Sequence, residues 1–310
     1  MKRKMIILGS CCLCIIIIIV TILVLSMNGI IGDYKYEFNT DERWTIRLTE
    51  YTGNDTKVVL STHIGPFKIK YVTKETFSNS KTVEKIVVPP DIEYKSMVIG
   101  NNVLKELEYE YGRKRDCVTV VNCKNFEKVV FPDGLEEIVR DYLACPKLNS
   151  VVIPSSVKKI VFDFDETGYS EAHKNDKYYV VGDGVLLFYH GSKEEIVIPE
   201  GVKSINHYCV IGKENEDETK IVYLPDSLNM CLEFGYENEV IFYGNNQDIS
   251  YDDLYDVKSI IKAPKGAPVE QFCKDNDIEF QESTEEEEAI RKEKTEAAAS
   301  EITYQENEKW

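Results

Sequence analysis

Histidine, tryptophan and positive charge are all scarce in this sequence. It has four histidines and two tryptophans among 310 residues, and Asp plus Glu outnumber Lys plus Arg by 54 to 37. The resulting net charge of −17 excludes a nucleic-acid-binding surface, which requires clustered Lys and Arg. It also argues against unaided adhesion to anionic lipid. Because 43% of the residues are hydrophobic, the chain can still bury the core of one or two domains.

The motifs of common enzymes are also missing. There is no G-x-S-x-G, P-loop or Rossmann glycine fingerprint, and no histidine has metal-type spacing to another histidine or to a cysteine. The segment IVFDFDETG at 160–168 resembles the nucleophile loop of haloacid-dehalogenase-like phosphatases, with Asp163 as nucleophile and Asp165 as acid/base. Such an enzyme needs a doubly wound domain after this loop, whereas another repeat follows here. A phosphatase is therefore a remote alternative, and we predict neither catalysis nor a cofactor.

A second acidic cluster could bind calcium. Asp252, Asp253 and Asp256 lie close together, but they lack the glycine and terminal glutamate of an EF-hand loop. We therefore interpret the cluster as a solvated loop and predict no metal site.

The N-terminus predicts a membrane anchor. Lys2, Arg3 and Lys4 precede an uncharged apolar run over residues 5–27, and about 20 such residues suffice to cross a bilayer as a helix. A cleaved signal peptide has a shorter apolar region and a small-residue cleavage site, which we do not find. A lipidation site at Cys11 is the competing interpretation, but the long apolar run follows this residue instead of preceding it. We predict a cytoplasmic stub at 1–4, a transmembrane helix over 5–27, and the remainder outside the cell.

We interpret the cysteines outside the apolar run as buried thiols. They show neither C-x-x-C spacing nor the density of a disulfide scaffold, and they are Cys117, Cys123, Cys145, Cys209, Cys231 and Cys273. Because Cys123 and Cys145 occupy equivalent positions of consecutive repeat units, we expect them to stack on adjacent turns. A disulfide between these two remains open.

A repeated motif dominates the rest of the chain. Each copy is a short apolar run, a proline, two variable residues and an aliphatic residue. The copies are KIVVPPDI at 85–92, KVVFPDGL at 128–135, SVVIPSSV at 150–157, EIVIPEGV at 195–202 and IVYLPDSL at 221–228. Two of the gaps between successive copies are about twice as long as the other two, and we expect degenerate copies there, around CVTVVNC and YYVVGDGVLLFY. The resulting unit of about 22 residues lies within the range of leucine-rich repeats.

The residues of one unit predict a stacked coil. Branched residues such as Val129 favour a short strand, and the following proline ends it. Stacked units would align these strands in parallel and bury one continuous core. The expected core residues of one unit are Phe126, Val129, Phe131, Leu135 and Ile138. The predicted fold is a β-rich solenoid with parallel strands on one face and irregular or short helical turns on the other.

The repeats resemble the BspA-type leucine-rich-repeat family. YLACPKLNSVVIPSSVKKI at 142–160 matches the family pattern of aromatic-small stretch, cysteine, aliphatic strand and proline. Residues 46–77 resemble its N-terminal cap, although Ser61 stands where proline is usual, and residues 260–280 resemble its C-terminal cap. We therefore assign 28–281 to one repeat domain. The resemblance implies display on the cell surface and binding or adhesion.

Two polar inserts and the C-terminus depart from the repeat pattern. We expect the inserts at 165–178 and 212–220 to project as loops, either as solvated spacers, which we favour, or as loops that recognise a partner. The acidic tail at 282–310 is rich in glutamate, and its composition predicts a mobile or loosely helical solvated extension.

In the leucine-rich-repeat frame, two columns of each strand should face outward on a concave sheet. The predicted ligand-binding residues are Lys85, Val87, Lys128, Val130, Val152, Glu195, Val197, Ile221, Tyr223 and Ile241. β-Propensity alone would also explain the apolar column. The expected partner is a protein or another surface macromolecule. The alternative function is an envelope scaffold that docks a protein of the same cell.

Overall fold

The computed structural model describes residues 29–39, 41–42, 44–92, 96–161, 164–206, 220–229, 231–232, 240–245, 249–250 and 259–305. The predicted membrane span at 5–27, Asp163 and the Asp252 cluster lie outside these residues. Within them, no helix is both long enough and apolar enough to cross a bilayer.

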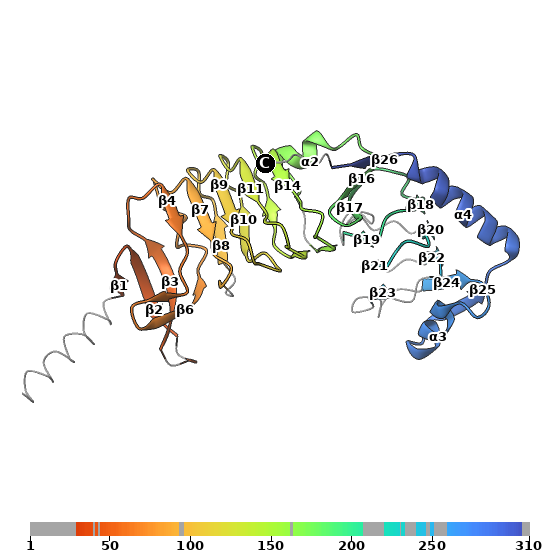
Figure 1. Ribbon diagram of the computed structural model, residues 1–310, viewed down its shortest axis with the longest axis horizontal. Helices are drawn as coiled ribbons and strands as arrows, with labels where there is room; N and C mark the ends of the chain where they lie inside the picture. The colour runs from red at the N-terminus through yellow and green to blue at the C-terminus, as the bar shows by residue number, and fades with distance from the viewer. Residues whose placement is uncertain are drawn as a thin grey trace, which may run out of the picture.

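The chain forms an elongated arch of short strands with helices α3 and α4 at its C-terminal end (Figure 1). Two ladders build the N-terminal half. The first contains β1 (Ile30–Ile31), β2 (Tyr34–Phe38), β3 (Thr45–Tyr51), β6 (Phe67–Val72), β8 (Ser96–Ile99), β10 (Val118–Val121) and β13 (Tyr142–Leu143), with β5 (His63–Ile64) beside β6. The second contains β4 (Lys57–Val59), β7 (Lys85–Val88), β9 (Glu106–Tyr109), β11 (Lys128–Val130) and β14 (Ser150–Val152). A small third ladder pairs β12 (Glu137–Ile138) with β15 (Lys159–Ile160).

The strand register confirms a solenoid with the predicted repeat length. Val129 pairs in parallel with Leu107 on one side and with Val151 on the other. In the first ladder Val120 pairs in the same way with Val98 and Tyr142. The expectation of irregular or helical turns opposite the Pro-ended strands is therefore wrong for this half. Each turn has strands on more than one side because its other segments are also branched and apolar.

The register also relocates the degenerate repeats. CVTVVNC forms β10 of the first ladder, whereas the missing copy of the Pro-ended strand is β9, which pairs with both β7 and β11. YYVVGDGVLLFY forms an antiparallel hairpin instead of a repeat strand. Its two strands are β16 (Tyr178–Val181) and β17 (Val185–Tyr189).

The C-terminal half has three sheets and the longest helix of the described chain. The hairpin lies in a sheet with β19 (Ser204–Ile205) and β26 (Ile302–Tyr304). The next sheet contains β18 (Glu195–Val197), β20 (Lys220–Tyr223), β22 (Val240–Tyr243), β24 (Ser259–Ala263) and β25 (Glu279–Glu282). β21 (Cys231–Leu232) pairs with β23 (Ile249–Ser250). The helices are α2 (Gly168–Ala172), α3 (Pro268–Asp275) and α4 (Glu285–Ala299).

The predicted core is confirmed. All five expected core residues of the unit at 126–138 are buried in one hydrophobic cluster that runs through the N-terminal half. A second cluster fills the C-terminal half and includes Val222, Phe242 and Ile261. No single turn could bury these faces, so neighbouring turns stabilise one another.

A left-handed residue recurs at the end of four successive turns. Gly100, Asn122, Ala144 and Glu166 occupy equivalent positions of successive turns and have φ values of 68°, 56°, 50° and 54°. Each is followed by a buried residue that begins the next segment. These residues are Asn101, Cys123, Cys145 and Thr167. The side-chain oxygen of Asn101 accepts hydrogen bonds from two backbone N–H groups, and that of Thr167 caps α2.

The structure confirms the prediction of buried thiols for every cysteine whose side chain it describes. Cys117, Cys123, Cys145 and Cys273 are buried, free thiols. Cys123 lies against Cys145 of the next turn, and its hydrogen bond with that thiol, together with burial, raises the pKa of Cys123. Cys209 and the side chain of Cys231 lie outside the described residues.

The first insert is not a projecting loop. Thr167 caps α2, and the buried ring of Tyr169 packs against Tyr179 and Phe188. Asp165 is an exposed turn residue, and the strands that follow it form the antiparallel hairpin instead of a doubly wound domain. The described residues after Asp165 therefore do not form the doubly wound domain that the phosphatase alternative requires. The second insert lies almost entirely outside the described residues.

Candidate binding surface

The outward face of the second ladder is the first part of the candidate surface. Along β11 and β14 the middle valine is buried and the two flanking residues are half exposed, as predicted. We call this surface the open face. It is made by Lys57, Val59, Lys85, Glu106, Glu108, Lys128, Val130, Ser150 and Val152.

Charges on the open face form a defined pattern. The Lys85 ammonium contacts the Glu106 carboxylate at 3.0 Å and also pairs with Glu108. Both contacts raise the pKa of Lys85, and the contact with Glu108 has the larger effect. Sequence reasoning missed both glutamates because β9 has no proline to mark it. Val130 and Val152 lie next to this ion-pair cluster, in register with Glu108.

Two predicted surface residues occupy outward positions of their strands but are buried. Val87 is buried, although the other outward positions of its ladder are partly exposed. Tyr223 is only 8% exposed. Its ring stacks on Tyr243 at 5.1 Å, and the Lys294 ammonium lies 4.4 Å from the ring centroid. The prediction that Tyr223 faces solvent is therefore wrong, because the C-terminal helix covers it.

The acidic tail is a packed element of the domain. α4 begins with a capping box in which Thr284 and Glu287 bond each other's backbone N–H groups. The Thr284 N–H and the Lys262 ammonium hold the pKa of Glu287 at about 2. Lys294, near the other end of α4, pairs with Glu195 of β18 at 2.6 Å. The expectation of a solvated extension is wrong for residues 285–305.

A buried arginine attaches α4 to the sheet beneath it. The Arg291 side chain is 0% exposed. It donates to the Leu224 carbonyl and to the Asp226 carboxylate at 2.8 Å, and to the Glu288 carboxylate at 3.1 Å. A buried charge requires such partners. Arg291 therefore fixes the helix over β18 and β20, so that part of the predicted C-terminal surface is occupied by the chain itself.

The remaining predicted residues of this half are Val197, Ile221 and Ile241. All three are half exposed, and they lie on β18, β20 and β22 next to the Glu195 and Tyr223 positions that α4 contacts.

The last described strand, β26, leads the chain from the C-terminal half to the N-terminal half. β26 pairs in parallel with β16. Beyond it, the Gln305 amide accepts from the Ile153 N–H and donates to the Ile153 carbonyl, both at 3.2 Å. Residues 285–305 therefore connect the C-terminal cap to the edge of the open face, and Figure 1 shows α4 and β26 along the outer side of that half.

A cleft of about 370 Å³ lies where β26 meets β14, and we call it the junction cleft. The His173 ring stacks on Tyr179 with centroids 3.7 Å apart, and its Nδ1 bonds Asp176 at 2.8 Å. Tyr304 borders the cleft and is exposed, whereas Val152 connects it to the open face. Exposed aromatic rings beside half-buried apolar groups are typical of protein-binding surfaces.

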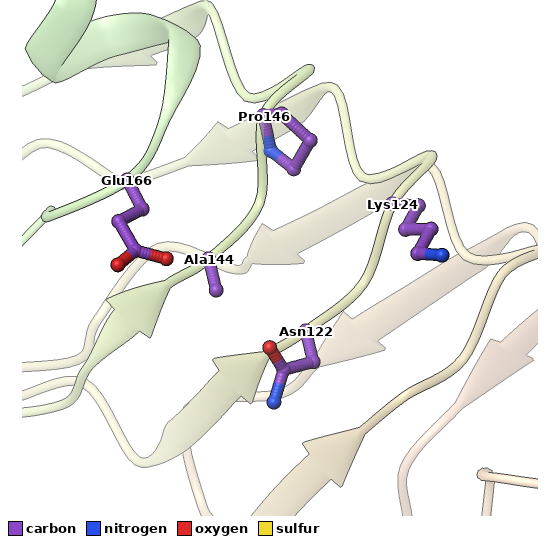
Figure 2. A pocket seen from close by; sticks show the side chains of 5 residues that line it. All are labelled: Asn122, Lys124, Ala144, Pro146 and Glu166. Atoms are coloured by element: carbon purple, nitrogen blue, oxygen red, sulfur yellow. The ribbon is translucent and has the colours of Figure 1, made fainter.

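A separate depression follows the left-handed turns. Asn122, Ala144 and Glu166 contribute equivalent positions of three successive turns, with Lys124 and Pro146 beside them (Figure 2). Lys124 and Glu166 lie at opposite ends of it, so its polar groups do not converge on one point. Nor do three or more metal-ligating side chains gather anywhere among the described residues.

Comparison with known families agrees with the repeat register. Residues 56–164 match the BspA type leucine rich repeat region, with six copies. The chain contains BspA-type leucine-rich repeats. The matched span coincides with the stretch in which β4 to β14 and β6 to β13 form parallel ladders, so the BspA-type repeats include the whole open face.

Three solved structures are similar to this chain. The Treponema pallidum leucine rich repeat protein is 18% identical, over 67% of this chain and 84% of its own, with a TM-score of 0.29. A leucine rich cell surface protein from Faecalibacterium prausnitzii A2-165 is 14% identical, over 84% and 96%, with a TM-score of 0.24. The pneumococcal vaccine antigen PcpA is 13% identical, over 82% and 98%, with a TM-score of 0.33. No curated protein matches the sequence.

Proposed function

We propose that this protein is a membrane-anchored, extracellular leucine-rich-repeat protein that binds a protein or another surface macromolecule and has no catalytic role. The apolar run at 5–27 supports the anchor, and the basic residues before it support an external repeat domain. The BspA-type repeats support binding in general.

One observation supports the location of the binding surface. α4 packs on β18 and β20 of the C-terminal sheet, but among the described residues no helix packs to the same extent on β4, β7, β9, β11 or β14, and α2 only borders the junction cleft at the end of this ladder. A face that combines an ion-pair cluster with half-exposed valines and ends in an aromatic cleft has the polar and apolar groups that protein partners use. We therefore place the binding residues at Lys85, Lys128, Val130 and Val152, with Tyr304 at the edge.

Photo-crosslinking on intact cells tests this assignment. A benzophenone amino acid at Val130 should form covalent adducts with a macromolecule, because this side chain is outward-facing on the proposed surface. The same amino acid at Lys292, which is exposed on the same helix as Arg291, is the matched control and should form none.

The cells are irradiated alone and on a surface coated with host-matrix protein. Adducts that require the coating support adhesion, and adducts formed by the cells alone support the envelope scaffold. Equal adduct formation from Val130 and Lys292 would reject the open face as the binding surface.

A further inference from the structure

Two large aromatic side chains lie exposed together on the N-terminal cap. Trp44 is 63% exposed and Phe38 is 41% exposed. Both rings contact Phe67, with centroid distances of 5.9 Å and 5.2 Å. The Asn39 N–H donates to the Thr45 carbonyl at 3.0 Å, which holds the end of β2 against the start of β3. Phe38, Trp44 and Phe67 thus form one surface, which we call the cap patch.

The backbone holds the indole of Trp44 outward. Trp44 has a φ of 63°, in the left-handed region that bulky residues rarely adopt. Its carbonyl accepts the Lys68 N–H at 3.0 Å, so the neighbouring strand fixes this conformation. Apart from its contact with Phe67, this unfavourable backbone geometry leaves most of the Trp44 side chain in solvent, so burial offsets little of its cost. Such geometry concentrates at functional positions.

The chain enters the domain beside this patch. β1 runs antiparallel to β2, and the Tyr36 N–H donates to the Gly29 carbonyl at 2.7 Å. Gly29, the first described residue, therefore lies at the Tyr36–Phe38 end of β2. The predicted span ends at Met27, and two residues extend at most about 7 Å. β1 and β2 accordingly lie at the N-terminal extreme of the arch (Figure 1).

Two ion pairs lie beside the patch. Glu37 pairs with Arg47, and Glu42 pairs with Lys70. Like Glu42, which has the larger effect, Asp41 lies close enough to Lys70 to raise its pKa, so each of the two cations here faces at least one carboxylate, within a chain of charge −17. A tethered surface also needs little intrinsic affinity, because the anchor keeps its effective concentration at the membrane high.

We infer that the cap patch docks on the lipid headgroup layer of the membrane that holds the anchor, with Trp44 and Phe38 in the interface. Tryptophan prefers this zone because its ring is apolar and its N–H can bond to headgroups or water. Docking would fix the angle at which the solenoid projects from the membrane. This inference rests on the proposed anchor at 5–27.

Tryptophan fluorescence tests the inference, because the chain has only Trp44 and Trp310. The full-length Trp310→Phe variant is reconstituted in phosphatidylcholine vesicles, with and without lipids brominated near the headgroup. The expected result is a blue-shifted Trp44 emission that loses most of its intensity with brominated lipid and is shielded from aqueous acrylamide. A second variant with both tryptophans changed to Phe and Tyr111→Trp is the control. Tyr111 is 78% exposed and lies further along the solenoid, so its emission should respond to acrylamide alone.

Vesicle flotation separates the two hypotheses. Protein that fails to float with the vesicles would contradict the anchor itself. Protein that floats while Trp44 remains quenched by acrylamide and not by brominated lipid would leave the anchor standing and overturn the docking. Trp44 shielded from both quenchers would show that a second copy of the chain covers the patch, and this would also overturn it.

Discussion

Replacing Arg291 with alanine should destabilise the attachment of α4 by about 3 kcal/mol, a cost typical of removing one partner of a buried ion pair. The change leaves the Leu224 carbonyl without its donor and Glu288 without its cation. The loss should stay near the lower end of the usual range, because the side chain of Asp226 is half exposed and water can solvate it.

Hydrogen exchange of residues 285–305 is the suitable measurement, because solenoids can unfold locally. Exchange in α4 and β26 should become much faster in the variant, while β9 and β11 remain protected. Lys292→Ala, at the exposed neighbouring position, is the control and should change little. Equal protection in the two variants would mean that Arg291 does not hold the helix.

The stability of the N-terminal half should fall as the pH rises from about 4 to about 7, because of Asp116. This carboxyl accepts hydrogen bonds from the Val139 N–H at 2.6 Å and the Tyr142 hydroxyl at 3.1 Å. Burial nevertheless raises its pKa to about 7, from 3.8 in the unfolded chain. Between these values the folded state binds a proton that the unfolded state has released. The stabilisation is therefore complete at low pH and is lost as the pH passes through 7.

The expected size of this loss is on the order of 3 kcal/mol. Asp116→Asn retains the side-chain shape but cannot titrate. Urea unfolding of both proteins at pH 5 and pH 8 isolates the contribution of this residue, because all other titrating groups are shared. The variant should gain stability relative to the natural chain on going from pH 5 to pH 8. A difference that does not change with pH would show that Asp116 is ionised throughout.

The repeat could be predicted because its signal is local and periodic. Val129, Phe131 and Pro132 specify a strand and its end within a short segment, and the next copy repeats the pattern one turn later. The same spacing predicted the adjacent burial of Cys123 and Cys145, which the structure confirms. The first ladder was not predicted as a separate sheet, because strands such as β8 and β13 have no proline at their ends.

Strand β9 could not be recognised from composition. Its sequence ELEY alternates charged and apolar residues, and Glu110 stands where other copies have proline. Only pairing with β7 and β11 fixes it as a strand, since these neighbouring strands of the same ladder supply its hydrogen bonds.

The packing of α4 could not be predicted from the sequence for a related reason. Its buried positions are Arg291, Thr295 and Ala298, which share one helix face but contain no large apolar residue. Such a face gives no hydrophobic periodicity, and the surrounding glutamates suggest a solvated chain. The contacts that hold it are polar and come from Leu224 and Asp226, which lie far earlier in the sequence. The covering of Tyr223 follows from this helix and could not be predicted without it.

Labelling of intact cells tests the central claim, that the repeats are displayed outside a membrane anchor. Tyr111→Cys places a thiol at a strongly exposed position, whereas the four described native cysteines are buried. A membrane-impermeant maleimide should label this variant on intact cells well above the natural chain, and Lys2→Cys should react only after permeabilisation. Labelling of Tyr111→Cys only after permeabilisation, or of Lys2→Cys on intact cells, would contradict the account.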